Sequence, residues 1–115
     1  MTVTATVIAW ARRVQPEVLL FLETTAEWHR ALAPLAAEYP HGHYVTDRNH
    51  HGLLLLSRWP LTDLVTEAPG GRVARPVIFA TVTKEGAPLR VAAMHATWPM
   101  RPRNAHQRAL DLEEY

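Results

Sequence analysis

A short apolar run that ends in a carboxylate is the feature that most constrains this chain. Residues 18–22 are Val-Leu-Leu-Phe-Leu, with Pro16 before them and Glu23 and two threonines after them. A run of this length predicts a strand that is buried on both faces. Ligands of open α/β sheets bind at the carboxyl ends of strands, so Glu23 is placed to hold a cation or polarise a substrate. The alternative is that Glu23 only begins the next turn.

The length and charge of the chain limit the classes of function open to it. Its 115 residues suit one domain, 1–115, with a modest core. A formal net charge of +1 gives no reason to expect strong nucleic-acid binding, which usually needs a basic patch. Without cysteine, disulfides and thiolate metal sites are excluded. No apolar run approaches the roughly 20 residues of a membrane helix, and no signal peptide follows Met1.

The first half of the sequence predicts helices that alternate with strands. Apolar positions spaced by three and four over residues 3–14 predict an amphipathic helix with arginines near its end. Thr-Thr-Ala-Glu at 24–27 fits a capping box, so a second helix should follow, kinked or divided by Pro34. Residues 44–45 suit a short strand before a polar loop at 47–51. This alternation of helices and strands is typical of a layered α/β fold. The strand expected before the first helix is missing from the pattern.

The second half of the sequence is richer in strands. Residues 52–57 form another buried apolar run, and residues 61–67 suit an edge strand. Two β-rich runs, 77–83 and 89–95, flank a Lys-Glu-Gly-Ala-Pro turn and predict a hairpin. The pattern is helical again from 103 to 115. Strands linked by helices early and by a hairpin late predict a mixed sheet.

His95 is the second residue for which the sequence predicts a chemical role. It ends the second hairpin strand and precedes a loop that contains Arg101 and Arg103. A histidine that leaves a strand into a cationic loop suits a general acid or a phosphate contact, and the alternative is a histidine that only packs. Arg58 and Arg75 also have two interpretations: each neutralises a substrate phosphate, or each pairs with a surface acid.

Four histidines raise a zinc hypothesis that their spacing does not favour. They are His41, His43, His50 and His51. They lack paired helical spacing, and no cysteine or close set of carboxylates completes four ligands, so we expect most of them to be solvated. The chain also lacks a P-loop, a dinucleotide-binding glycine motif and a serine nucleophile elbow. Nucleotide-binding and serine-hydrolase interpretations therefore lack their usual motifs.

Three segments in this order resemble the endonuclease/exonuclease/phosphatase superfamily, whose fold is DNase I-like. Residues 16–23, Pro-Glu-Val-Leu-Leu-Phe-Leu-Glu, are similar to the family's Pro-Asp-Val-Leu-Leu-Leu-Gln-Glu strand. Residues 52–61, Gly-Leu-Leu-Leu-Leu-Ser-Arg-Trp-Pro-Leu, are similar to its glycine-led strand with a Leu-Ser-Arg ending. Residues 89–95, Leu-Arg-Val-Ala-Ala-Met-His, are similar to its strand that ends in Thr-His. The order and spacing of the three make the match specific across residues 5–112.

The resemblance implies an α+β fold in which a two-layer β-sandwich of mainly antiparallel strands, present here in part, is flanked by helices. It also implies hydrolysis of phosphate esters, as by a phosphodiesterase, nuclease or phosphatase, with Mg²⁺ or alternatively Mn²⁺ as cofactor. Glu23 carries over as the metal-binding glutamate, and His95 as the histidine that contacts the phosphate or assists proton transfer. His51 matches the position of a polar pocket residue, and Arg58 and Arg75 are expected substrate contacts.

The sequence departs from the family pattern in ways that bear on activity. The family's asparagine on its first strand, its Gly-Asp-x-Asn motif and its terminal Ser-Asp-His motif have no counterpart here. We therefore expect the chain to be an interior piece of a longer domain that is inactive by itself. The resemblance further implies a bacterial branch of the family, whose members often carry membrane segments before the catalytic domain.

A non-catalytic α/β module is the rival hypothesis. Such a module would bind a partner or form a homodimer through exposed strand edges. The sequence does not identify the substrate of the phosphoesterase interpretation, although near-neutral charge disfavours DNA. No targeting segment distinguishes a cytoplasmic from a membrane-associated location.

Overall fold

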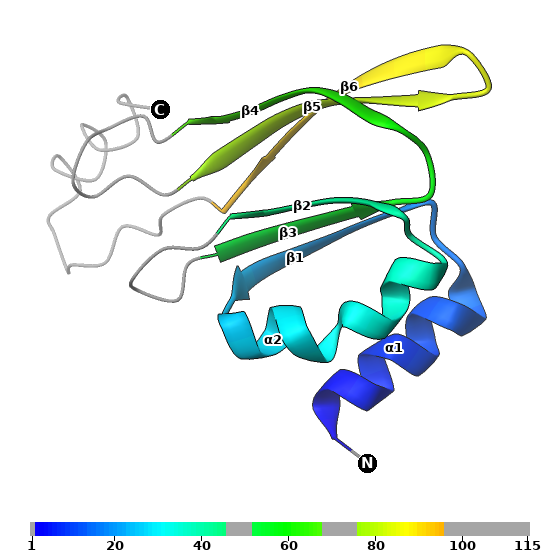
Figure 1. Ribbon diagram of the computed structural model, residues 1–115, viewed down its shortest axis with the longest axis vertical. Helices are drawn as coiled ribbons and strands as arrows, with labels where there is room; N and C mark the ends of the chain where they lie inside the picture. The colour runs from blue at the N-terminus through cyan, green and yellow to red at the C-terminus, as the bar shows by residue number, and fades with distance from the viewer. Residues whose placement is uncertain (1, 46–51, 68–75, 96–115) are drawn as a thin grey trace, which may run out of the picture.

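The computed structural model describes residues 2–45, 52–67 and 76–95, which form a layer of helices and two sheets (Figure 1). The elements are α1 (Val3–Val14), β1 (Val18–Thr24), α2 (Ala26–Ala31), the 3-10 helix η1 (Ala33–Ala37), β2 (His41–Val45), β3 (Gly52–Ser57), β4 (Leu61–Glu67), β5 (Val77–Lys84) and β6 (Ala87–Met94). One three-stranded sheet has the order β1-β3-β2, and the other has the order β4-β5-β6. Helices cover one face of the first sheet, and the second sheet lies on its opposite face. The predicted partial sandwich flanked by helices is confirmed.

The mixed sheet predicted from the connections is wrong. β1 and β2 run in the same direction and are linked by helical segments, but β3 lies between them. Because β3 is antiparallel to both neighbours, and β5 is antiparallel to β4 and β6, every strand pair in the described part is antiparallel. A helical connection therefore does not produce a parallel pair here.

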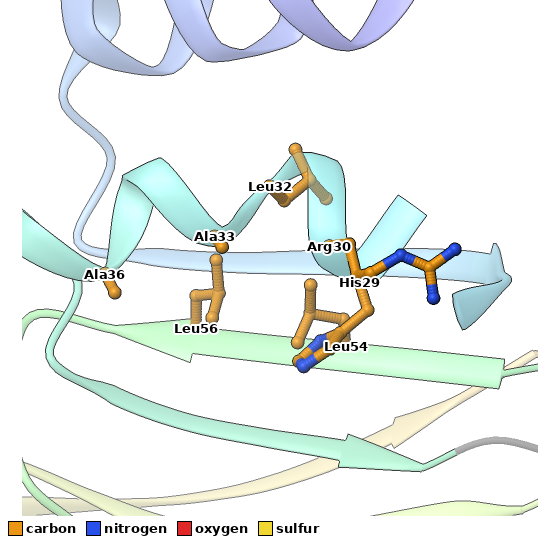
Figure 2. Close-up of a pocket in the computed structure, with 7 residues that line it drawn as sticks. All are labelled: His29, Arg30, Leu32, Ala33, Ala36, Leu54 and Leu56. Atoms are coloured by element: carbon orange, nitrogen blue, oxygen red, sulfur yellow. The ribbon is translucent and has the colours of Figure 1, made fainter. Parts of the chain in front are cut away.

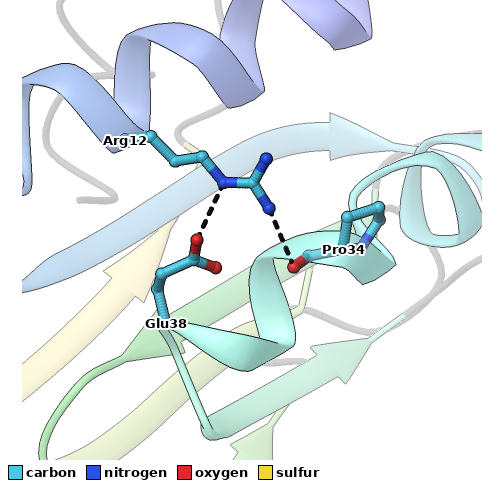
Figure 3. Close-up of polar contacts among 3 residues, drawn as sticks. All are labelled: Arg12, Pro34 and Glu38. Atoms are coloured by element: carbon cyan, nitrogen blue, oxygen red, sulfur yellow. Dashed lines mark hydrogen bonds and ion pairs between the residues drawn. The ribbon is translucent and has the colours of Figure 1, made fainter.

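The helix layer packs on the first sheet through alanine, leucine and tyrosine side chains. The buried residues of this cluster are Ala11, Leu19, Leu32, Leu35, Tyr39 and Leu54. A charged contact adds to this packing, as Figure 3 shows. Arg12 of α1 donates from Nε to Oε1 of Glu38 at 2.8 Å and from Nη2 to the carbonyl oxygen of Pro34 at 3.4 Å. Both contacts join α1 to η1 or to the residue that follows it.

Pro34 divides the second helix, as the sequence predicts. α2 ends at Ala31 and continues as η1, which carries this proline in its first turn. The helix is capped one residue later than predicted, because the hydroxyl of Thr25 accepts from the Trp28 amide at 3.2 Å. Thr24 remains in the β1–β3 ladder opposite Gly52 and is therefore not the cap.

The second core lies between the two sheets. Its buried residues are Leu53, Leu55, Ile78, Ala80 and Ala93. Leu54 faces the helices instead, so β3 is buried on both faces as predicted.

β1 is not buried on both faces, which corrects the prediction for residues 18–22. It forms an edge of its sheet, and Leu20 and Leu22 remain 41% and 45% exposed. β4 is likewise an edge strand, as predicted.

The hairpin of β5 and β6 is confirmed, with a tighter turn than the sequence indicated. Lys84 pairs with Ala87, so only Glu85 and Gly86 form the turn. Both have positive φ, at 52° and 83°. The loop predicted at 47–51 and the helix predicted at 103–115 lie outside the described residues. No helix within the described ranges is long and apolar enough to cross a membrane.

Candidate active site

Glu23 lies at the end of β1, where the pairing with β3 changes register. Leu22 pairs with Leu53, but the next pair joins Thr24 to Gly52, so Glu23 is an extra residue in the ladder. Its backbone is left-handed, with φ of 57°, and its side chain is 60% exposed. An extra residue of this kind is a β-bulge, which redirects the side chains around it. The carboxylate is thus presented to solvent at one end of the first sheet.

His95 directly follows β6, at an edge of the second sheet. Its Nε2 lies 3.5 Å from Oε1 of Glu23, and its side chain is 27% exposed. The two residues are 72 positions apart (95 − 23) and belong to different sheets. The structure therefore brings together the two residues that the sequence singles out for catalysis. Their contact across the sheets is a feature that sequence reasoning had not stated.

The predicted substrate-binding residues are placed differently. His51 lies outside the described residues, although its neighbour Gly52 pairs with Thr24 beside Glu23. Arg75 also lies outside them. Arg58 follows the opposite end of β3, where Ser57 pairs with the first residue of β1. The structure therefore does not group Arg58 with Glu23.

Arg58 has neighbours of its own at that end of the first sheet. Its guanidinium carbon lies 5.3 Å from the centre of the Tyr39 ring, and its amide donates to the Glu17 carbonyl at 3.0 Å. A cation over an aromatic face is a stabilising arrangement. These contacts hold Arg58 at the end of β3 remote from Glu23.

Glu23 fits one position in the coordination of a magnesium ion. Mg²⁺ usually keeps several waters and takes only one or two carboxylates from the protein. A carboxylate that is 60% exposed at a strand end leaves room for those waters. Within the described ranges, no three His, Cys, Asp or Glu residues gather as a metal site. Glu23 thus supplies only one of the ligands that a Mg²⁺ ion would need.

The histidines considered for zinc do not form a centre in the described part of the chain. His43 contacts Oγ1 of Thr66 through Nε2 at 2.9 Å, which links β2 to β4 across the two sheets. His50 and His51 lie outside the described residues. The zinc hypothesis thus gains no support from His41 and His43.

A cavity of about 340 Å³ lies on the other side of the first sheet, between β3 and the helical segments (Figure 2). Leu54 and Leu56 point from β3 toward the short side chains of Ala33 and Ala36. His29, which stacks on Tyr44 with ring centres 4.2 Å apart, also lines it. Neither Glu23 nor His95 contributes to its wall. The cavity is therefore separate from the candidate active site.

Gly52 is the residue of this region that sequence reasoning missed. A Cβ at this position would lie 2.6 Å from the carbonyl oxygen of Thr24 and 2.8 Å from that of Val45. A side chain therefore does not fit between the three strands. The available signal was a glycine inside a strand pattern, which often marks a bulge or a close approach of backbones.

Comparison with known proteins places this geometry in a wider context. The model of the endonuclease/exonuclease/phosphatase family matches residues 2–115. The crystal structure of truncated TDP2 from Caenorhabditis elegans is similar in fold, with a TM-score of 0.69 at 14% identity. It matches 96% of this chain, which spans 46% of that one. The crystal structure of selenomethionine TDP2 from the same organism also has a TM-score of 0.69, at 13% identity. The match covers 96% of this chain and 35% of the TDP2 chain. The search of curated proteins found no match.

Proposed function

The chain belongs to the endonuclease/exonuclease/phosphatase family, and from this membership we propose that it carries part of the catalytic site of a divalent-metal-dependent phosphoesterase. The resemblance noted in the sequence and the partial DNase I-like fold agree with that family. The observation that carries the proposal is the contact of 3.5 Å between Glu23 and His95, made at one end of the two stacked sheets. An acid beside a histidine at an accessible site is suited to phosphate-ester hydrolysis.

In the proposed reaction the two side chains have different tasks. Glu23 holds a divalent cation, Mg²⁺ or Mn²⁺, through its exposed carboxylate. When bound, such a cation neutralises the charge that develops on the phosphoryl oxygens. His95 contacts a phosphate oxygen or moves a proton, as its imidazole nitrogens allow. Among the described residues, no group of three His, Cys, Asp or Glu side chains completes a metal site around Glu23.

Replacement of each residue in the complete protein tests the proposal. We expect Glu23→Gln to abolish metal-dependent hydrolysis of an activated phosphodiester, because the amide has no charge with which to hold the cation. We expect His95→Ala to lower turnover by about 10²-fold or more. The measurement is the initial rate as a function of Mg²⁺ concentration. Glu27→Gln, at an exposed carboxylate in the first turn of α2, is the matched control and should keep full activity. Full activity of Glu23→Gln would exclude the proposed metal ligand.

A self-associating module without catalytic activity is the second candidate. The observation that favours it is that β1 pairs on one side only among the described strands, with Leu20 and Leu22 exposed. An exposed apolar edge strand is a template for pairing with another chain. This candidate predicts a homodimer with no metal-dependent activity.

A further inference from the structure

The side chain of Glu23 does not lie on the helix side of the first sheet, where the alternation of a regular strand would place it. It lies on the side of the second sheet. Leu19 and Phe21 pack with the helices, and successive side chains of a strand alternate between its faces. Regular alternation would therefore turn Glu23 toward the helix layer. Its carboxylate instead reaches His95, which belongs to the second sheet on the other face.

The bulge accounts for this change of side. Residues directly opposite each other in a sheet share a face, and Phe21 is opposite Leu54 on the helix side. The next position on that face of β3 belongs to Gly52, and its partner is Thr24 rather than Glu23. Thr24 has thus taken the ladder position that alternation assigns to Glu23. The extra residue is left unpaired and is free to point toward the second sheet.

The bulge depends on two features: a left-handed backbone at Glu23 and the absence of a side chain at Gly52. A left-handed conformation is costly for residues other than glycine, and the first position of such bulges is commonly glycine. A glutamate with φ of 57° therefore stores strain at this point. Gly52 admits the close approach of the bulge, because a Cβ there would meet two carbonyl oxygens at 2.6 and 2.8 Å.

We propose that Gly52 and the strained bulge at Glu23 are a positioning device that turns the carboxylate of Glu23 across the sheet toward His95. The catalytic value of this device depends on the proposed role of Glu23 as a metal ligand. Gly52 has no side chain with which to bind a metal or a substrate. It acts through Glu23 and is therefore a positioning residue.

A cross-linking measurement tests the geometry without any metal or activity. The chain has no native cysteine, so Glu23→Cys with His95→Cys creates a unique pair for a short bismaleimide. We expect Gly52→Ala to slow cross-linking by about tenfold, because the reaction depends on proximity and orientation. Gly42→Ala is the matched control: its Cβ would meet the flexible Cδ2 of Leu56 at 3.0 Å, away from Glu23. Equal rates in the two backgrounds would overturn the proposal.

The strain is measured separately, which keeps the proposal testable if Gly52→Ala does not fold. We expect Glu23→Gly to melt about 4 °C above Glu23→Ala, because glycine adopts this backbone without strain. At Leu22, whose φ is not positive, glycine should instead melt below alanine. A Glu23→Gly protein that melts no higher than Glu23→Ala would contradict the strained bulge.

Metal binding then connects the device to the proposed function. We expect Gly52→Ala to weaken Mn²⁺ binding by about tenfold and Gly42→Ala to leave it unchanged. Unchanged Mn²⁺ binding in a folded Gly52→Ala protein would overturn the positioning role. If the protein without substitutions binds no Mn²⁺, the proposed function fails. The cross-linking and melting measurements still decide whether the bulge directs the side chain of residue 23 toward residue 95.

Discussion

At the scale of single residues, Glu17 and Lys84 form a contact that joins the two sheets at the end remote from Glu23. The ammonium of Lys84 donates to Oε1 of Glu17, and it lies 5.6 Å from the centre of the Trp59 ring. Hydrogen bonding to Lys84 lowers the pKa of Glu17 below its ordinary value of 4.5. The same bond raises the pKa of Lys84 above its ordinary value of 10.5.

Because of these pKa shifts, the Glu17–Lys84 pair stabilises the fold only over a limited range of pH. The contribution of Glu17 to stability is present above 4.5, its ordinary value, and is lost as the pH falls through its lowered pKa. The contribution of Lys84 is present below 10.5 and is lost as the pH rises through its raised pKa. We expect Lys84→Met to lower the melting temperature slightly near pH 7, because exposed pairs contribute little. This difference should vanish in strong acid, when Glu17 is protonated.

Melting curves of Lys84→Met and the parent chain at several pH values test this expectation. Arg90→Met, at an exposed cation on β6, is the control for loss of one positive charge. A melting difference that persists below the lowered pKa of Glu17 would show that Lys84 stabilises the fold by packing rather than by its charge.

At the scale of elements, the β5–β6 hairpin has a turn whose sequence is not optimal for its backbone. Glu85 and Gly86 both have positive φ, the pattern of a type I′ turn, in which asparagine followed by glycine is preferred. We expect Glu85→Asn to stabilise the chain by about 0.5–1 kcal/mol, because asparagine tolerates the left-handed backbone better than glutamate. Urea unfolding measures the change. Gly86→Ala, the opposite substitution in the same turn, should destabilise the chain, and a stable Gly86→Ala variant would argue against this turn type.

The elements follow from local patterns where those patterns are strong. Helix α1, strand β3 and the β5–β6 hairpin were all predicted, because periodicity and turn residues specify them locally. The burial of β1 on both faces was predicted wrongly, because burial of Leu20 and Leu22 depends on which strands lie beside and above them. The Glu23–His95 contact depends on how the two sheets stack, and local periodicity does not contain that information.

The bulge at Glu23 was also beyond prediction from the sequence. Its backbone conformation opposes the usual preference of glutamate, so the local signal points away from it. The glycine at 52 was visible, but its function depends on the carbonyl oxygens of Thr24 and Val45, which come from two other strands. Residues that act through such contacts are where sequence patterns and structure are expected to disagree.

At the scale of the whole molecule, the outer strands of the two sheets differ in their protection against pairing. The β6 edge carries Pro88 and Arg90, and His43 of the β2 edge contacts Thr66 of β4. The β4 edge has a register shift near Asp63, whose backbone is left-handed. Charges, prolines and bulges on edges oppose association. β1 has its bulge and its charge, Glu23, only at its C-terminal end, and the five residues from Val18 to Leu22 include neither a charge nor a proline.

The self-associating candidate therefore predicts that a second copy of the chain pairs edge to edge with β1. Leu20→Lys should abolish this association, because the substitution places a charge in the middle of the apolar edge. Leu89→Lys is the matched control, since Leu89 is 64% exposed but lies on β6. Sedimentation velocity over a range of protein concentrations measures the fraction of dimer. A parent chain that stays monomeric, or equal loss of dimer in both variants, would exclude the β1 edge as the interface and leave the phosphoesterase proposal without its rival.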